Sequence, residues 1–450
     1  MNSSSHPSQR PQPGPAHVRP IWDGENLVAP SPYAPPPEPE PAPRFWTKDR
    51  AFGSKTDPRR IVGLDAARGF ALLGMIAIHV LPAYNEYTGE PTFIWTLFAG
   101  HAAALFAVLA GITVALLTGG SRPHVGSRRK RSRTSLITRA LLIFVLGLLL
   151  DQLHLTVYNI LPYYGLMFLL AVPLISLRIR YLQLGVAAFA TLGPVAVFLT
   201  NQWGGYTTIL NPQFSDLFNM PVDTFITLFI GGTYPAATWM TYLCLGMAVG
   251  RLNLHWLINH VNLIIVGGFL SVVGFVMSTF LVDYAGGFRQ LYYYSDGYEA
   301  QDITDIIDYG PQDHLPTDTW WWLTINGPHT NTPFSILSSA GLALVLIGVF
   351  LVTARVSRYI LEPLISIGSM SLTLYTVHLL SLFLFSSTFK TEPVLWFIIQ
   401  VLGALIFGVG WHLAVGRGPL ESVISRTCSR VAVALVPDSP EPVITEAKSS

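Results

Sequence analysis

Three ionisable side chains occur in an otherwise apolar segment near the start of the chain. Residues 64–82 read LDAARGFALLGMIAIHVLP, so Asp65, Arg68 and His79 lie among aliphatic residues. Charged groups are costly inside a bilayer, and those found in membrane helices commonly mark a pathway or a reaction site. In a helix, the eleven residues from Arg68 to His79 bring the chain back to within about 20° and advance it about 16 Å. The spacing therefore predicts one polar stripe along a membrane helix, with apolar side chains between its two ends.

Further polar residues are expected at a depth similar to that of His79, near the outer ends of other membrane helices. They are His101, Asp151, His154, His329 and His378. A histidine can have a pKa near the working pH and commonly acts as a general base, often beside a carboxylate. The candidate catalytic residues are therefore His79, His101, Asp151, His329 and His378.

Structural roles compete with this interpretation. Asp65 and Arg68 could pair at the inner interface, and His79 could join two helices by a hydrogen bond. Metal binding ranks lower, because no pair of these histidines has the i, i+4 spacing of a helix-borne zinc site. The acidic stretch DITDIID lacks the glycine and spacing of a calcium loop, so a solvated surface is favoured there. We expect no metal site and, since no G-x-S-x-G motif occurs, no serine nucleophile of that kind.

Membrane helices are the elements that must position these residues. The chain of 450 residues is 51% hydrophobic and 12% charged, whereas roughly a quarter of the residues in a soluble domain are charged. After Ile61 it divides into apolar segments near the length of about twenty residues that crosses a bilayer. These segments are near 62–83, 93–118, 136–152, 156–177, 181–200, 232–252, 261–282, 334–354, 361–387 and 393–414. The expected fold class is an all-α, polytopic membrane helix bundle with about ten transmembrane helices.

The connections between these segments alternate in charge. SRPHVGSRRKRSR, at 121–133, contains six Lys/Arg and no acid, whereas residues 283–333 contain eight acids and one basic residue, Arg289. Basic connections favour the cytoplasmic side of a membrane. The pattern predicts that both termini are cytoplasmic and that the acidic connections lie outside, in a multi-pass protein of the cell inner (plasma) membrane.

The two ends of the chain differ in composition from the helical part. Residues 1–58 are polar and proline-rich, which predicts a disordered cytoplasmic tail. A transmembrane domain is expected at 59–430, and a second disordered tail at 431–450. The two cysteines, Cys244 and Cys428, indicate neither a disulfide framework nor a thiolate metal site.

Several segments resemble one superfamily of membrane acyltransferases. Arg68 and His79 have the R-x10-H spacing of the first helix of the acyltransferase-3 family, and FAVLAGI at 106–112 is similar to the segment that follows in such proteins. Other segments resemble bacterial relatives of heparan-alpha-glucosaminide N-acetyltransferase: LDAARGFALLGM, ILPYYGLMFLLA, YLCLGMAVGRLNL, HTNTPFSILSSAGLALVLIG and GRGPLE. Together these segments cover most of residues 61–421.

This resemblance implies a transmembrane acyltransferase. Such an enzyme would move an acyl group, with acetyl expected, from cytoplasmic acyl-CoA to a hydroxyl or amine of an extracytoplasmic glycan or glycolipid. His79 would be the general base or the acyl carrier, and Asp65 and Arg68 would support acyl-CoA binding or helix packing. The expected partners are therefore acyl-CoA, the glycan acceptor and membrane lipids, with no nucleic acid and no metal cofactor.

The phosphates of a CoA could be held by cationic side chains near the cytoplasmic surface. Arg128, Arg129 and Lys130 are the candidates. A basic run beside a membrane more commonly sets topology and contacts anionic lipid, so both interpretations remain open for these residues.

Two other functions remain as alternatives. The same polar pathway could serve a transporter or flippase of a lipid-linked or small substrate, although no internal repeat of the kind common in transporters is evident. A membrane scaffold would need no intramembrane ionisable set. The small residues of GLALVLIG, at 341–348, could pack within the chain or support a homodimer.

Overall fold

The computed structural model describes residues 21–23, 26–28, 60–389 and 391–437. The chain divides into two units, Met1–Gly53 and Ser54–Ser450. In the first, β1 (Ile21–Asp23) and β2 (Asn26–Val28) form a short antiparallel hairpin, which the prediction of a disordered tail did not include. The other residues of that predicted tail lie outside the described part of the chain, as do residues 438–450.

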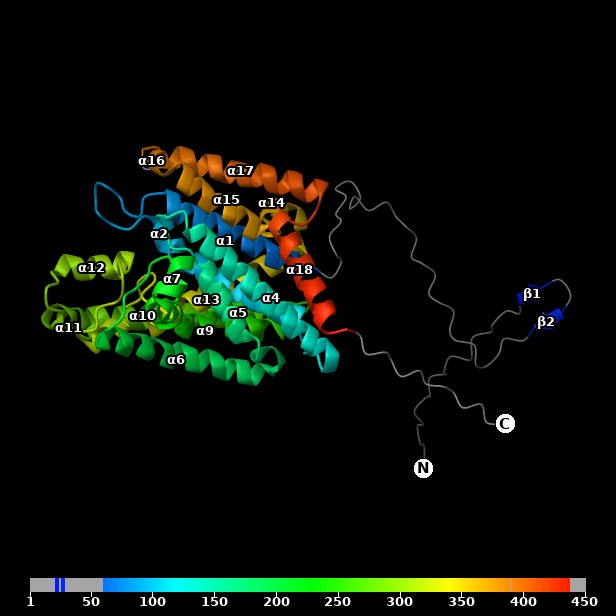
Figure 1. The fold of residues 1–450 in the computed structure, drawn as a ribbon, viewed down its shortest axis with the longest axis horizontal. Coiled ribbons are helices and arrows are strands. Elements are labelled where there is room, and N and C mark those ends of the chain that lie inside the picture. The colour runs from blue at the N-terminus through cyan, green and yellow to red at the C-terminus, as the bar shows by residue number, and fades with distance from the viewer. Residues whose placement is uncertain (1–20, 24–25, 29–59, 390, 438–450) are drawn as a thin grey trace, which may run out of the picture. The chain divides into compact units, whose positions relative to one another are not determined.

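The described residues of the second unit form helices and connections without strands (Figure 1). The elements of its first half are α1 (Val62–Val80), α2 (Phe93–Phe98), α3 (His101–Leu117), α4 (Gly126–Asp151), α5 (Leu161–Ala171), η2 (Leu174–Ser176), α6 (Ile179–Trp203), α7 (Phe214–Asn219), α8 (Pro221–Ile226), η3 (Thr227–Gly231) and α9 (Ala236–Gly250). Those of its second half are α10 (Leu257–Thr279), η4 (Phe280–Tyr284), α11 (Gly287–Tyr294), α12 (Ala300–Tyr309), η5 (Trp320–Thr324), α13 (Pro333–Val356), α14 (Arg358–Gly368), α15 (Ser371–Leu384), α16 (Ser386–Phe389), α17 (Pro393–Ala414) and α18 (Pro419–Leu435).

All ten predicted apolar segments are helical, but they are not ten equal spans. Among the described residues, seven helices are long and apolar enough to cross a membrane, and α14 with α15 forms an eighth candidate bent by 60°. The remaining two predicted spans are α5 and α9, which have 11 and 15 residues. Both are largely buried among other helices, so their backbone ends need not reach the lipid surface. The second unit is therefore an all-α helix bundle of the kind found in multi-pass membrane proteins, and the number ten stays a prediction.

The small residues at 341–348 are used within the chain. A Cβ added to Gly341 would lie 2.5 Å from the carbonyl oxygen of Gly267 on α10, and one added to Gly348 would lie 2.8 Å from that of His260. Only glycine allows α10 and α13 to approach so closely. This packing accounts for the motif, and a homodimer remains a prediction.

The basic connections meet at one end of the bundle. Arg251, which follows α9, is buried and donates to the carbonyl oxygens of Ala115, Gly120 and Ile175. These acceptors lie at the end of α3, just after it and in η2, so the guanidinium joins the connection after α9 to the connections that follow α3 and α5.

The acidic connections meet at a second set of contacts. Trp95 Nε1 donates to the carbonyl of Asp308, Tyr158 Oη to that of Gln312, and Tyr309 Oη to that of Gly89. The two groups of connections thus alternate along the chain as the charge pattern predicts. Which group faces the cytoplasm stays a prediction.

The acidic segment 283–333 is folded, and seven of its eight acids are exposed, in keeping with the solvated surface expected from its charge. Leu291, Ile303, Trp322 and Ile325 form a separate apolar core with Phe198 of α6. On the amphipathic helix α12, Asp302 and Asp305 are exposed while Ile303 is buried, so a count of charges in the sequence did not reveal this packed core.

The C-terminal helix extends beyond the predicted domain boundary at residue 430. Helix α18 continues to Leu435 and packs on α4. Its Glu421 accepts hydrogen bonds from the backbone N–H groups of Leu372 and Thr373, at 2.8 and 3.1 Å. A carboxylate at this position caps the N-terminus of α15, where the bent pair is interrupted.

Candidate active site

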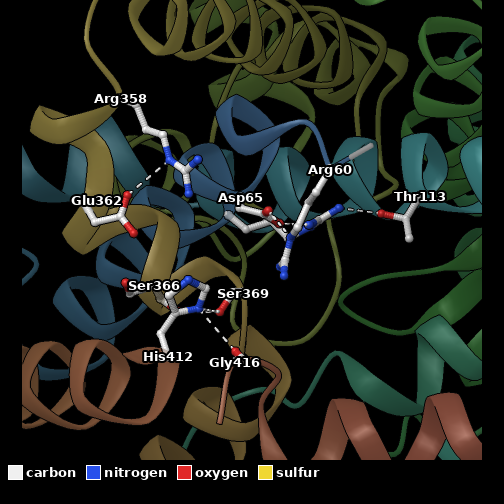
Figure 2. Close-up of polar contacts among 10 residues, drawn as sticks. Arg60, Asp65, Thr113, Arg358, Glu362, Ser366, Ser369, His412 and Gly416 are labelled. Carbon is white, nitrogen blue, oxygen red and sulfur yellow. Dashed lines mark hydrogen bonds and ion pairs between the residues drawn. The ribbon is translucent and has the colours of Figure 1, made fainter. Parts of the chain in front are cut away.

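Asp65 lies between two arginines at the start of α1. Arg60 Nε approaches Asp65 Oδ2 at 2.5 Å, and Arg68 donates to Asp65 Oδ1 and to Thr113 Oγ1, both at 2.6 Å. Figure 2 shows Asp65 beside Arg60, with Thr113 of α3 across from them. Asp65 is 2% exposed, so a charged carboxylate there requires these partners. The ion pair fixes the guanidinium of Arg68 against α3.

Arg68 lines a cavity of about 510 Å³, termed here the inner cavity. Its wall is mostly apolar and includes Met75 of α1, Ala103 of α3 and Tyr375 of α15. Arg60, Arg68, Arg139 and Arg417 are its cationic lining residues. Because Arg60 precedes α1 and Arg417 follows α17, cations border the end of the cavity where the basic connections meet. The cavity thus combines cations with a long apolar wall.

The predicted phosphate ligands do not line this cavity. Arg128, Arg129 and Lys130 are exposed near the start of α4. Their proposed role stays a prediction, and the arginines that the cavity presents are others. Arg139 was detectable as a lone cation within the apolar run LITRALLIF, and Arg417 lies in GRGPLE.

The interruption between α14 and α15 borders the same cavity. Ser369 Oγ lies 3.3 Å from His412 Nδ1, which is also 3.2 Å from the carbonyl oxygen of Gly416 (Figure 2). Gly368 packs so closely on α1 that an added Cβ would lie 1.8 Å from the carbonyl oxygen of Asp65. The bend is thus held by α1 and by the end of α17, and it directs α15 along the cavity wall.

A second cavity, of about 360 Å³, lies beneath the acidic connections and is termed here the outer cavity. His101, His329 and Ser339 line it, together with Trp95, Trp239, Tyr242, Asn331, Asp283 and Asp308. Burial, reinforced by Asp305, raises the pKa of Asp308. No Lys or Arg lines the outer cavity among the residues that the structure describes. Aromatic rings, hydroxyls and carboxylates are groups suited to a sugar.

The two cavities reach neighbouring residues of one helix. His101 lines the outer cavity and Ala103 the inner cavity, and they are two residues apart on α3, about 3 Å along the helix axis. At roughly 100° per residue their side chains project about 160° apart, so the two cavities reach the same depth along the helix from opposite sides of α3.

His79 and His378 form a pair just beyond residues that line the inner cavity, although neither histidine is itself a lining residue of the two cavities. His79 Nδ1 is 2.9 Å from His378 Nε2, and the two rings are stacked with centroids 5.2 Å apart. Each residue follows, by about one helical turn, a residue that lines the inner cavity, Met75 or Tyr375. His378 is 3% exposed, and its Nδ1 is 2.5 Å from Gln400 Oε1 of α17. The predicted stripe from Arg68 to His79 therefore follows the inner cavity and ends at a histidine pair.

His101 and His329 approach from the outer side. His101 Nδ1 is 2.9 Å from Ser339 Oγ, and the ring of His329 packs edge-on against Tyr234. His329 has a left-handed backbone, φ 56°, and its carbonyl oxygen accepts from Asn331 Nδ2 at 3.1 Å. Asn331 Oδ1 in turn accepts from Trp239 Nε1 at 2.8 Å. Burial, with a contribution from His101, lowers the pKa of His329 to about 4. Electrostatic interactions also connect His329 with His79, so four of the predicted histidines form one group.

Asp151 belongs to a different cluster. Its Oδ1 accepts a hydrogen bond from Asn159 Nδ2 at 2.9 Å. Its backbone carbonyl oxygen accepts from Gln213 Nε2, which also contacts His154 Nδ1. Among the described residues, Asp151 makes no hydrogen bond to any of the four grouped histidines. The carboxylate partner expected for the base is absent from those contacts, and a second imidazole takes that place at His79.

Sequence reasoning missed Gln400, Ser339 and Asn331. Gln400 offered one signal, since it is a single amide side chain within the apolar segment WFIIQVLGALIF. The described residues contain no group of three or more His, Cys, Asp or Glu that could hold a metal ion.

Comparison with known families gives one match. Residues 60–266 match the family model described as heparan-alpha-glucosaminide N-acetyltransferase, catalytic. This confirms the resemblance to heparan-alpha-glucosaminide N-acetyltransferase relatives, over a segment that includes Arg68, His79 and His101 but ends before His329 and His378. No curated protein matches the chain.

Proposed function

We propose that this chain, a multi-pass membrane protein matching the catalytic family of heparan-alpha-glucosaminide N-acetyltransferase, transfers an acyl group across the membrane. The donor is cytoplasmic acyl-CoA, with acetyl-CoA the simplest choice, and the acceptor is a hydroxyl or amine of an extracytoplasmic glycan or glycolipid. The observation that supports this most directly is that the two cavities, one lined with cations and one with none among its described residues, reach the same depth along α3.

The inner cavity suits the donor. CoA has an anionic nucleotide end and a long, largely uncharged arm that ends in the thioester. Arg60, Arg139 and Arg417 would meet the phosphates as charge-assisted partners, and the apolar wall would take the arm. Arg68, held by Asp65, lies along the same route. The outer cavity, with its tryptophans and carboxylates, would take the acceptor.

His79 is the proposed general base. Its Nδ1 is engaged by His378, whereas its Nε2 has no hydrogen-bond partner among the described residues. This nitrogen takes the proton of the acceptor as the acceptor oxygen or nitrogen attacks the thioester carbonyl carbon. The C–S bond then breaks, and the thiolate receives the proton from His79, which yields acylated acceptor and free CoA. His378 orients the ring and shares the positive charge that develops on it.

Transfer by purified protein in vesicles tests the proposal. We expect labelled acetyl-CoA to acylate an amino sugar or glycolipid on the opposite side. His79→Gln should reduce the rate by about 10²-fold to 10⁴-fold, the usual contribution of a general base. The matched control is His314→Gln, because His314 is exposed in the acidic segment.

Three results would count against this assignment. Unchanged transfer by His79→Gln would remove His79 from the mechanism. An acyl group trapped on His79 after acid quenching would replace the base role with that of a covalent carrier. Movement of substrate without acylation would favour the transporter.

A further inference from the structure

Gln400 is an amide in a helix that is otherwise apolar. Helix α17 has a mean hydropathy of 2.1 over its most apolar window, and only 11% of that window is buried inside the protein. Gln400 nevertheless turns its side chain inward, to His378 of α15. A primary amide is costly to hold among apolar groups without a partner, and Gln400 Nε2 is buried and has none. The position of this residue therefore calls for an explanation.

Three side chains form a single chain of hydrogen bonds. Gln400 Oε1 contacts His378 Nδ1 at 2.5 Å, and His378 Nε2 contacts His79 Nδ1 at 2.9 Å. They come from α17, α15 and α1, so the chain crosses three helices. A neutral imidazole has one nitrogen that donates and one that accepts, and an amide oxygen only accepts.

These rules fix every proton along the chain. Because Gln400 Oε1 accepts, His378 Nδ1 carries the proton and His378 Nε2 accepts. His79 Nδ1 must then donate, and the free electron pair of His79 is left on Nε2. We propose that Gln400 is a positioning residue that sets the tautomer of His79, through His378, so that Nε2 can act as the base. The tautomer of His79 follows from the hydrogen bonds alone, whereas its role as a general base rests on the proposed function.

The opposite orientation of the Gln400 amide would give the opposite tautomer of His79. If Gln400 Nε2 donated to His378 Nδ1, each bond along the chain would reverse, and His79 would carry its proton on Nε2. That ring could not remove a proton from an acceptor. The amide thus selects between a competent and an incompetent imidazole without touching a substrate.

The competing role is simple adhesion between helices. A polar side chain in a membrane helix often does no more than hold its neighbour. Adhesion would be weakened by any substitution that removes the hydrogen bond, but it predicts no change in the tautomer of His79. The two roles therefore differ in a property that can be measured.

The test combines nitrogen-15 NMR of histidine-labelled protein with steady-state kinetics. Such spectra distinguish protonated from unprotonated ring nitrogens, and the His79→Gln and His378→Gln variants assign the signals. In the wild type we expect His79 to be protonated at Nδ1 and unprotonated at Nε2. In Gln400→Met, which has a similar length and no acceptor oxygen, both tautomers should be populated.

The kinetic expectation follows from the same change. Gln400→Met should lower kcat at least tenfold, while KM for acyl-CoA stays the same; a wrong tautomer costs about 10⁴-fold in the serine protease triad, which sets the upper limit. Gln400→Glu keeps an acceptor and should restore both the tautomer and most of the rate. Ser381→Ala is the matched control, since Ser381 contacts only the backbone carbonyl of His378 and should leave both readouts unchanged.

Two outcomes separate this inference from the proposed function. A wild-type tautomer of His79 in Gln400→Met would overturn the positioning role, whatever the activity. A tautomer that follows Gln400 in a protein without acyl transfer would support the positioning of the ring and overturn the acyltransferase. Should Gln400→Met fail to fold, Gln400→Asn, which is one methylene too short, replaces it with the same expectations.

Discussion

His329 is a base enclosed at the edge of the outer cavity, and its charge state ties stability to pH. Its pKa is lowered to about 4 by burial and by His101, whereas in an unfolded chain a histidine titrates near 6.5. Between these two values the unfolded chain binds a proton that the folded protein does not. The stabilisation is therefore complete above about pH 6.5 and is lost as the pH falls toward 4.

We expect the unfolding temperature in detergent to fall across this interval. His329→Gln, which does not titrate, should make the decrease shallower. His314→Gln, at an exposed histidine, should show the same dependence of unfolding temperature on pH as the wild type. A slope that is identical in all three proteins would show that His329 does not carry this proton.

The sequence predicted the residue types of the site better than their contacts. The ionisable residues within an apolar segment indicated Arg68 and His79 as candidates, because membrane helices rarely contain such residues without a function. The partner of His79 is His378, 299 residues later. Spacing along one helix cannot reveal such a contact, and depth alone did not show that the carboxylate of Asp151 bonds to Asn159 rather than to a histidine.

At the level of the helices, Arg251 joins three helix connections at the end of the bundle where the basic connections meet. Its guanidinium reaches three backbone carbonyls from two other connections, a geometry that requires the planar fork of an arginine. Lysine at this position would satisfy fewer of the acceptors. We expect Arg251→Lys to destabilise the protein by about 1–3 kcal/mol, the cost of leaving a buried polar group without a partner.

Thermal unfolding in detergent measures this effect. The matched substitution is Arg355→Lys, because Arg355 is an exposed cation of the same predicted surface. The unfolding temperature should fall for the first variant and stay the same for the second. Equal shifts would show that Arg251 acts only as a surface charge.

Hydropathy located the helices but not their breaks. Every predicted apolar segment became a helix, since a backbone in lipid must satisfy its own hydrogen bonds. The bend between α14 and α15 depends on Glu421, His412 and Gly368, which come from distant parts of the chain or from tight packing. Helix α18 was missed because amphipathic helices are not apolar enough to be recognised as spans.

For the whole molecule, orientation in the membrane is the first property to check. The native cysteines, Cys244 and Cys428, are buried, so labels should report introduced positions. Asp313→Cys lies in the acidic segment and should react with an impermeant reagent from outside the cell. Ser127→Cys, in the basic connection, should react only after permeabilisation; the reverse result would invert the assignment of the two cavities.

The charge of the outer cavity predicts which acceptors are used. Asp283 and Asp308 line it, and its described residues include no Lys or Arg. Arg289, the one basic residue of the acidic segment 283–333, lines a separate depression that Asp283 also borders. Like charges brought together cost several kcal/mol, so a neutral or amine-bearing sugar should be acylated at least about tenfold faster than one carrying a carboxylate or sulfate.

Competition between the two kinds of sugar in one assay measures this preference. Asp308→Asn should reduce the ratio of the two acylation rates, because the variant removes one negative charge without changing the size of the side chain. A preference for the anionic sugar in the wild type would contradict the assignment of this cavity to the acceptor.

The shared depth of the two cavities along α3 has an electrical consequence. Water that fills both cavities would conduct each bulk potential deep into the protein, so most of the membrane voltage would fall across the thin layer that contains His79 and His378. A proton that moves through this layer would then experience nearly the full field, about 2.3 kcal/mol for each 100 mV. Acylation of the acceptor carries a hydrogen toward the thiol as the acyl group leaves it, and the turnover rate should therefore respond to the polarity of the vesicle.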